Sequence, residues 1–199
     1  MSSDWQIYKV EDICADEDGS ISIGPFGSRL KSNEYVEKGI PVIRGKNISE
    51  NPGFSGEFVN ISENKADSLG SSNVYKDELV FPHRGAIGKV GIVNDKNRYV
   101  LSSSLMKLKC NRGFVNPKFV YYFFKSRLGR HELLKNASQV GTPGIGQPLT
   151  SLRNIDIPIP PKSYQDKVDK YLTTIDQKIQ INQQTNETLE AMAQAIFKS

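Results

Sequence analysis

The chain has 199 residues, of which 37% are hydrophobic, and its formal net charge is +4. This hydrophobic content can supply a packed core, which excludes wholesale disorder. The N-terminus lacks the apolar segment of a secretory signal, and no apolar run approaches the roughly 18 residues that span a bilayer, so we expect a cytoplasmic protein.

Short apolar runs separated by turns predict a series of strands in the first half of the chain. The runs are Gly39–Gly45, Glu78–Phe81, Ala86–Val93 and Tyr99–Cys110. Several glycines lie inside these patterns, which indicates bulges or sharp bends in a curled sheet. We therefore predict an α+β fold in which residues 1–160 form one domain, with a curled mixed β-sheet and a few helices.

A helix is predicted after these strands. Asn116 and Pro117 are typical of an N-cap followed by proline at the first helical position. Apolar side chains then recur at helical spacing from Phe119 to Leu128,. We expect this helix to end near Gly129, and we expect its aromatic residues to pack in the core instead of forming a base-stacking platform.

The last third of the chain predicts a loop, a strand and a long helix. Val140–Leu152 has three glycines and two prolines, which is typical of a loop,. Ile155–Ile159 alternates like a strand until a double proline stops it,. Ser163 is the predicted N-cap of the helix, with Asp166 in its first turn. The helical segment is predicted to occupy residues 161–199.

Apolar residues and two asparagines recur along this helix in alternating steps of four and three, which is the pattern of a heptad seam. The seam residues are Val168, Leu172, Ile175, Ile179, Asn182, Asn186, Leu189, Ala193 and Ile196. A helix from Ser163 to Lys198 would be about 54 Å long, at ~1.5 Å per residue. Asparagine layers inside a coiled coil weaken it but fix its register and partner number. We predict pairing with another helix, the alternative being that the helix packs along its own domain.

No segment affirmatively indicates catalysis. Asn51–Phe54 differs by one residue from the Asn-Pro-Pro-Tyr/Phe tetrapeptide with which amino-methyltransferases hold the target amine, but no glycine-rich turn precedes it to bind S-adenosylmethionine,. His83 and His131 have no second ligand at metal spacing, so no metal site is predicted. Cys14 and Cys110 are far apart in sequence, and we expect two reduced thiols.

The positive charge is concentrated in the middle of the chain, where residues 19–161 include 20 basic and 11 acidic residues. This excess favours a polyanionic partner, although a basic domain without such a partner is the simpler alternative. Lysine and arginine neutralise phosphates, and arginine, asparagine and glutamine can read base edges. The candidate DNA contacts on predicted turns are Arg29, Lys31, Ser32, Arg44, Lys46, Asn47, Arg84, Lys89, Gln139, Thr142 and Gln147.

Seven segments together resemble the DNA-specificity subunit of Type I restriction–modification systems. They are Ile23–Ser32, Gly39–Ile48, Leu79–Phe81 with Arg84–Gly88, Ser102–Leu105, Ile157–Pro161 with Gln165, Leu172–Asn182 and Glu190–Phe197. The most specific of these features is the double proline that leads into the heptad helix. The segments extend over nearly the whole chain.

The resemblance implies a full subunit with two target-recognition domains, each followed by a long helix, and antiparallel pairing of the two helices. This chain, with one domain and one helix, is then a half-subunit or a fragment of a prokaryotic protein. It would read part of a split double-stranded DNA site and pair as a homodimer, with the helices setting the gap. The chain itself would bind no cofactor, because separate methyltransferase subunits use S-adenosylmethionine to methylate adenine at N6, with or without an endonuclease subunit. A self-sufficient methyltransferase and a helical adaptor that binds protein instead of DNA are the alternatives.

Overall fold

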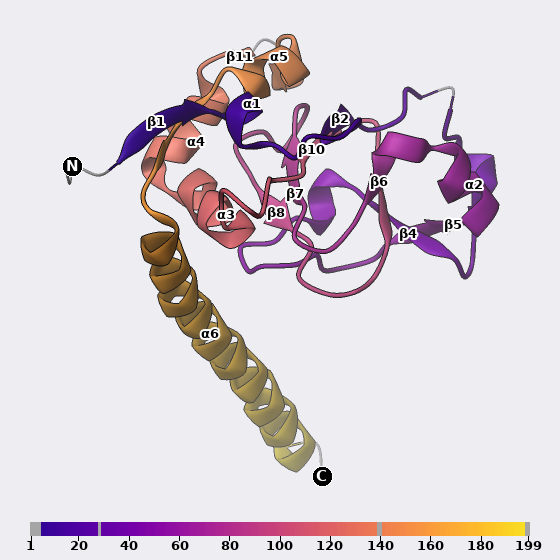
Figure 1. Cartoon of the computed structure of the whole chain (residues 1–199). Helices are drawn as coiled ribbons and strands as arrows, with labels where there is room; N and C mark the ends of the chain where they lie inside the picture. Colours follow the sequence, from indigo (N-terminus) through magenta and orange to yellow (C-terminus); the bar gives the residue numbers. More distant parts are fainter. Residues whose placement is uncertain (1–4, 28, 139–140, 198–199) are drawn as a thin grey trace.

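A computed structural model describes residues 5–27, 29–138 and 141–197. A domain of short strands and helices is followed by the long helix α6 (Lys162–Phe197), which projects from it (Figure 1). The prediction of an α+β fold with a mixed sheet and a long C-terminal helix is confirmed. Within the described ranges, none of the helices combines the length and apolar character that crossing a membrane requires.

Two β-sheets form the centre of the domain. One is antiparallel and contains, in order, β2 (Ile21–Ile23), β10 (Leu105–Leu108), β7 (Leu79–Pro82) and β8 (Gly91–Ile92). The other contains β3 (Tyr35–Val36), β5 (Val59–Ile61), β4 (Ile40–Ile43), β9 (Tyr99–Leu101) and β6 (Asn73–Val74), and it is mixed because β4 and β9 are parallel. The prediction of one strand over residues 99–110 is therefore wrong, since a turn at residues 102–104 sends the chain from the second sheet into the first.

A buried, ion-paired lysine joins the two sheets. Lys107 Nζ, on β10, donates to Glu78 Oε2 at 2.8 Å and to the Asn73 carbonyl oxygen at 2.7 Å. The Lys107 and Glu78 side chains are only 7% and 4% exposed. Removing one partner of such a pair leaves an uncompensated buried charge. Because Asn73 lies on β6, the hydrogen bond from Lys107 to its carbonyl ties β10 to the other sheet.

The main apolar core lies between the four-stranded sheet and helix α3 (Pro117–Lys125). The rings of Phe81 and Phe124 meet edge to face with their centroids 4.9 Å apart. Phe119 and Val120 are buried in the same cluster. The aromatic residues of the predicted helix are thus core residues, as predicted.

The predicted helix does not continue to Gly129. It ends at Lys125, and Ser126 Oγ accepts a hydrogen bond from the Gly129 amide at 3.1 Å, which caps a second helix, α4 (Arg127–Leu134). A Cβ on Gly129 would lie 2.1 Å from the Phe123 carbonyl oxygen, so the two helices approach each other at a point that only glycine fits. This capping by serine splits one helical pattern into two helices.

Shorter elements complete the domain. They are α1 (Val10–Ile13), η1 (Ser32–Glu34), η2 (Gly45–Asn47), α2 (Glu63–Ser68) and η3 (Gly70–Ser72), together with strands β11 (Ala137–Ser138) and β12 (Gly144–Ile145), which pair with each other, and helix α5 (Pro148–Arg153). The segment predicted to be a loop at residues 140–152 therefore contains a two-residue strand and most of a short helix. Proline at the first position of α5 suits a helix start, and the loop prediction missed it.

A two-stranded sheet leads into the long helix. β1 (Gln6–Lys9) pairs antiparallel with β13 (Asp156–Ile159), which confirms the strand predicted before the double proline. α6 already includes Lys162, so the prediction that Ser163 caps it is wrong. Instead, Lys162 Nζ donates to Asp166 Oδ1 at 3.0 Å across the first turn.

Candidate nucleic-acid interface

Several turns that are far apart in sequence meet at one end of the two sheets. The Gly24 amide, after β2, donates to the Leu105 carbonyl at 2.8 Å, and a Cβ on Gly24 would lie 1.9 Å from the Ser102 carbonyl oxygen. The Ser102 amide donates to the Ile43 carbonyl at 2.9 Å, at the end of β4. The ends of β2 and β4 are thereby held against the turn between β9 and β10.

The turn after β7 joins the same cluster. His83 Nε2 donates to the Ser103 carbonyl at 3.0 Å, and Arg84 forms an antiparallel bridge with Gly144. A Cβ on Gly45 would lie 3.7 Å from the Ala86 Cβ, so the turn after β4 is adjacent as well. We call this cluster the loop edge and define it as residues 24–27, 44–47, 83–86, 102–104 and 141–147.

Burial fixes the charge state of the histidine in this edge. Desolvation lowers the pKa of His83 below its ordinary value, while the backbone hydrogen bond to Ser103 opposes that shift. A neutral imidazole that donates from Nε2 fits the carbonyl partner. His83 is therefore a neutral support of the turn that carries Arg84.

The predicted DNA contacts are distributed between the loop edge and its two flanks. In the loop edge Lys46, Arg84, Thr142 and Gln147 are exposed and Arg44 is half-buried; on one flank Arg29, Lys31 and Ser32 are exposed, and on the other Lys89 is half-buried. Gln139 lies outside the described residues. Arg29 Nη2 donates to the Ser68 carbonyl at 3.0 Å, so the first flank lies against α2. The structure thus brings part of the predicted set together and places Arg29–Ser32 and Lys89 to either side.

Asn47 is a predicted contact whose side chain the fold uses for itself. Its side chain is fully buried, its Oδ1 accepts from the Arg44 amide at 3.0 Å, and its Nδ2 donates to the Ser55 and Glu57 carbonyls. The prediction that Asn47 contacts DNA is therefore wrong in this conformation, because all its hydrogen-bonding groups are turned inward. Arg44 Nη2 also donates to the Glu57 carbonyl, at 3.1 Å.

Three side chains on these surfaces were not predicted. Phe26 is 73% exposed in the loop edge, between the buried Pro25 and a glycine. Lys125 and Arg130, on α3 and α4, line a small hollow together with Lys89. The sequence signals for them are an aromatic residue flanked by proline and glycine in a basic segment, and basic residues at exposed helical positions.

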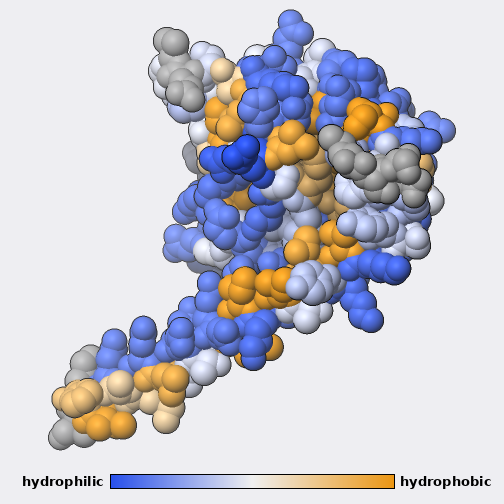
Figure 2. Space-filling view, turned by 90° about the vertical axis from the view of Figure 1, so that its left-hand side faces the viewer, coloured by the Kyte–Doolittle hydropathy of each residue, from blue (hydrophilic) through white to orange (hydrophobic). Residues whose placement is uncertain are grey.

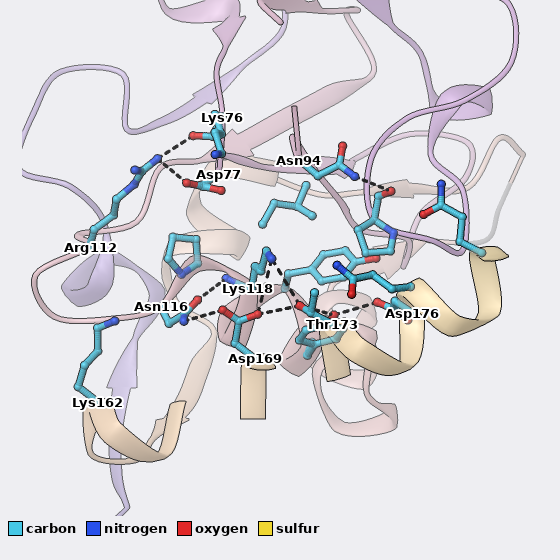
Figure 3. A pocket seen from close by; sticks show the side chains of 17 residues that line it. Lys76, Asp77, Asn94, Arg112, Asn116, Lys118, Lys162, Asp169, Thr173 and Asp176 are labelled. Atoms are coloured by element: carbon cyan, nitrogen blue, oxygen red, sulfur yellow. Dashed lines mark hydrogen bonds and ion pairs between the residues drawn. The ribbon is translucent and has the colours of Figure 1, made fainter. Parts of the chain in front are cut away.

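The long helix is held against α3 by polar side chains. Asn116 Nδ2 donates to Asp166 Oδ1 at 2.9 Å. It also donates to Asp169 Oδ2 at 3.0 Å, and the Tyr122 hydroxyl donates to Asp176 Oδ2 at 2.8 Å (Figure 3). Burial raises the pKa of Tyr122, and the carboxylate of Asp176 raises it further, so the phenol stays protonated and donates. A groove of about 530 Å³ runs beside these contacts, between the helix and the domain.

The predicted apolar seam is offset from this polar junction. Val168 and Leu172 are half-buried, whereas Ile175, Ile179 and Leu189 are 41%, 42% and 57% exposed. All described residues of α6 after Asp176 are exposed, and Figure 2 shows apolar surface on the projecting helix. The helix therefore packs along its own domain through its first turns, with a further contact from Asn51 at Gln183, and the pairing of the seam stays a prediction.

The tetrapeptide Asn51–Phe54 takes part in the fold. Asn51 Nδ2 donates to Gln183 Oε1 of α6 at 3.0 Å, and the Phe54 ring lies 5.6 Å from that of Tyr99 between centroids. Its two distinctive side chains therefore contact the helix and the core. Within the described ranges, no cluster of three or more His, Cys, Asp or Glu side chains is arranged to hold a metal ion.

The domain presents a basic loop edge, and α6 presents an exposed apolar seam. The chain belongs to the family of Type I restriction modification DNA specificity domains, whose model matches residues 2–191. This confirms the family resemblance drawn from the sequence.

Two relatives are specificity subunits of Type I restriction enzymes. HindI, from Haemophilus influenzae, is 28% identical over 99% of this chain and 40% of its own length, and MjaIX, from Methanocaldococcus jannaschii, is 28% identical over 100% and 44%. The chain thus spans less than half the length of either relative. The HsdS subunit from Thermoanaerobacter tengcongensis has a similar fold, with a TM-score of 0.62 and 17% identity over 91% of this chain and 39% of that one.

Proposed function

We propose that this chain recognises one part of a split double-stranded DNA target and directs an N6-adenine methyltransferase to it. The observation that carries the proposal is the loop edge, where the turns that carry Arg44, Lys46 and Arg84 lie together although they are distant in sequence, and where Arg84 bridges Gly144, three residues before Gln147. Cations that neutralise phosphates, beside amides that can read base edges, are what duplex recognition requires.

The rest of the assembly follows from the same proposal. S-adenosylmethionine binds to separate methyltransferase subunits, and this chain contributes no catalytic residue. The seam of α6 pairs antiparallel with a second copy, which places two loop edges on one duplex and lets helix length set the gap between half-sites. An endonuclease subunit joins the complex in systems that also cleave.

The salt dependence of DNA binding tests the phosphate contacts. Binding of the complex to its methylation site is measured by fluorescence anisotropy over a range of salt concentrations. Lys31→Ala and Arg84→Ala should each weaken binding to all sequences and reduce the slope of log K against log salt by about one unit. Lys170→Ala is the matched control, since it removes an exposed lysine from the long helix α6, away from the loop edge.

Base reading is tested separately. Gln147→Ala should lose about 1–3 kcal/mol on the specific site and leave non-specific binding unchanged. Binding that is independent of salt would favour the protein-binding adaptor instead. If all three variants bind DNA like the wild type, the loop edge is not the DNA interface, even though the family assignment stands.

A further inference from the structure

The fold places the two cysteines opposite each other. Cys14, after α1, and Cys110, after β10, form an isolated antiparallel β-bridge, and both are free thiols. The Ala15 amide donates to the Lys109 carbonyl at 2.8 Å, and the Asn111 amide donates to the Ile13 carbonyl at 2.9 Å. These bonds flank the cysteines, so the pair occupies a non-hydrogen-bonded site, with both side chains on the same face of the two segments.

This site has the geometry that a disulfide needs. Directly opposed residues at a non-hydrogen-bonded site have Cα atoms about 4.5 Å apart. Disulfides join Cα atoms that are separated by about 4.4–6.8 Å. Cys14 Sγ now donates to the Glu11 carbonyl at 3.1 Å, so a rotation about its Cα–Cβ bond has to release that contact before the bond can form. The expected separation lies within the disulfide range, at its short end.

The two thiols differ in access. Cys14 is half-buried and reachable from solvent, whereas Cys110 is 4% exposed. Burial raises the pKa of Cys14, and burial raises the pKa of Cys110 to about 12. Because the thiolate is the nucleophile, oxidation is slow at neutral pH and faster in alkaline solution. Cys14 is the thiol that an oxidant meets first.

We propose that Cys14 and Cys110 form a reversible disulfide that staples the N-terminal segment to the core. A low-molecular-weight disulfide such as oxidised glutathione is the oxidant. The Cys14 thiolate attacks one of its sulfurs and expels one thiolate, which gives a mixed disulfide. The Cys110 thiolate then attacks Cys14 Sγ and expels the second. The protein loses two protons and two electrons, and the oxidant is reduced to two thiols.

The position of the staple defines its effect. It links the segment that follows β1 and α1 to the segment that leads into α3, and both β1 and α3 lie at the base of α6. Leu105 is the first residue of β10 and follows the loop edge directly. Cys110 lies five residues further along the chain, and each residue of an extended strand adds roughly 3.3 Å to the distance from the loop edge. The cross-link therefore constrains the base of the helix and leaves the loop edge unchanged.

The experiment compares the full chain with its Cys14→Ser variant after incubation with oxidised glutathione at mildly alkaline pH. In the wild type, peptide mapping should find Cys14 joined to Cys110 within one chain. Both free thiols should be lost, and the melting temperature should rise by roughly 5–15 °C, because the cross-link closes residues 14–110 into a loop. A dithiol reductant should reverse all three changes.

Cys14→Ser is the matched control, since a hydroxyl at this half-buried position should preserve the fold and match the reduced wild type in melting temperature. It should show no rise on oxidation. Recovery of Cys14 carrying glutathione beside a free Cys110, cross-links between chains only, or no loss of thiols would each overturn the proposal. A Cys14–Cys110 bond that lowered the melting temperature would overturn the stapling effect. None of these outcomes depends on DNA binding.

Discussion

Lengthening α6 by one heptad tests whether the helix sets the distance between two recognition domains. The insertion belongs between Gln184 and Thr185, with apolar side chains at its two seam positions. Every described residue of α6 beyond Asp176 is exposed, and Asn51 bonds to the helix at Gln183, so this site preserves the junction with the domain. The variant therefore changes the length of α6 and leaves the loop edge and the register of the seam as they are.

The expected change follows from helix geometry. Seven residues add about 10 Å, at ~1.5 Å per residue. In an antiparallel pair both copies lengthen and still overlap completely, so the two domains separate by that distance. Along DNA, 10 Å corresponds to about three base pairs at ~3.4 Å per step. Three base pairs is the upper limit of the increase in spacer length, because successive base pairs also rotate about the duplex axis. A tilt of α6 relative to the DNA accommodates a smaller increase.

The assay is a map of methylated adenines across the genome after co-expression with the neighbouring methyltransferase. The half-sites should be unchanged, because the loop edge that reads them is unchanged, and the spacer between them should lengthen. The matched control has the same seven-residue insertion with serine at both seam positions. It has the same length but interrupts the seam, and it should lose methylation or lose a defined spacer.

An active variant with the original spacer would refute the idea that the helix is a ruler. An altered half-site with the original spacer would refute it as well, because the base sequence that the domain recognises would then depend on the length of α6.

Three further predictions concern the seam, the buried ion pair and the neutral histidine. Replacing Ile179 and Leu189 with aspartate puts charge into the exposed seam and should convert a dimer into monomers in sedimentation; a wild type that is already monomeric would argue against self-pairing. Glu78→Ala leaves Lys107 buried without its charge partner and should lower the free energy of unfolding in urea by about 3–5 kcal/mol, whereas a loss below about 1 kcal/mol would show that the buried pair contributes little to stability. Burial lowers the pKa of His83, so the unfolded chain binds its proton more readily; the stability contribution of the neutral ring is complete above pH ~6.5 and is lost as the pH falls below that value,. His83→Gln should flatten the decline of stability between about pH 6.5 and pH 5, by at most about 1.4 kcal/mol per pH unit, and equal slopes in the two proteins would contradict the shift.

The local periodicity of the sequence was sufficient to predict those features whose residues are one or two turns apart along the chain. The seam of α6 could be predicted because each seam residue is separated from the next by three or four positions. This spacing is visible in the sequence whatever the helix contacts. The same holds for the buried face of α3, where Phe119, Val120 and Phe124 recur at helical spacing and do pack in the core. The strand before the double proline was predictable because its isoleucines alternate.

Tertiary structure alone decided the features that depend on distant pairing. The turn at residues 102–104 divides one apolar run between two sheets, and no local pattern distinguishes that turn from a bulge. Asn47 looked like a free amide on a turn, yet the Ser55 and Glu57 carbonyls occupy it. Cys14 and Cys110 become partners only when the register of two segments is set. Register and connectivity bring together residues that are far apart along the chain, and a pattern that repeats every two to four residues carries no information about such contacts.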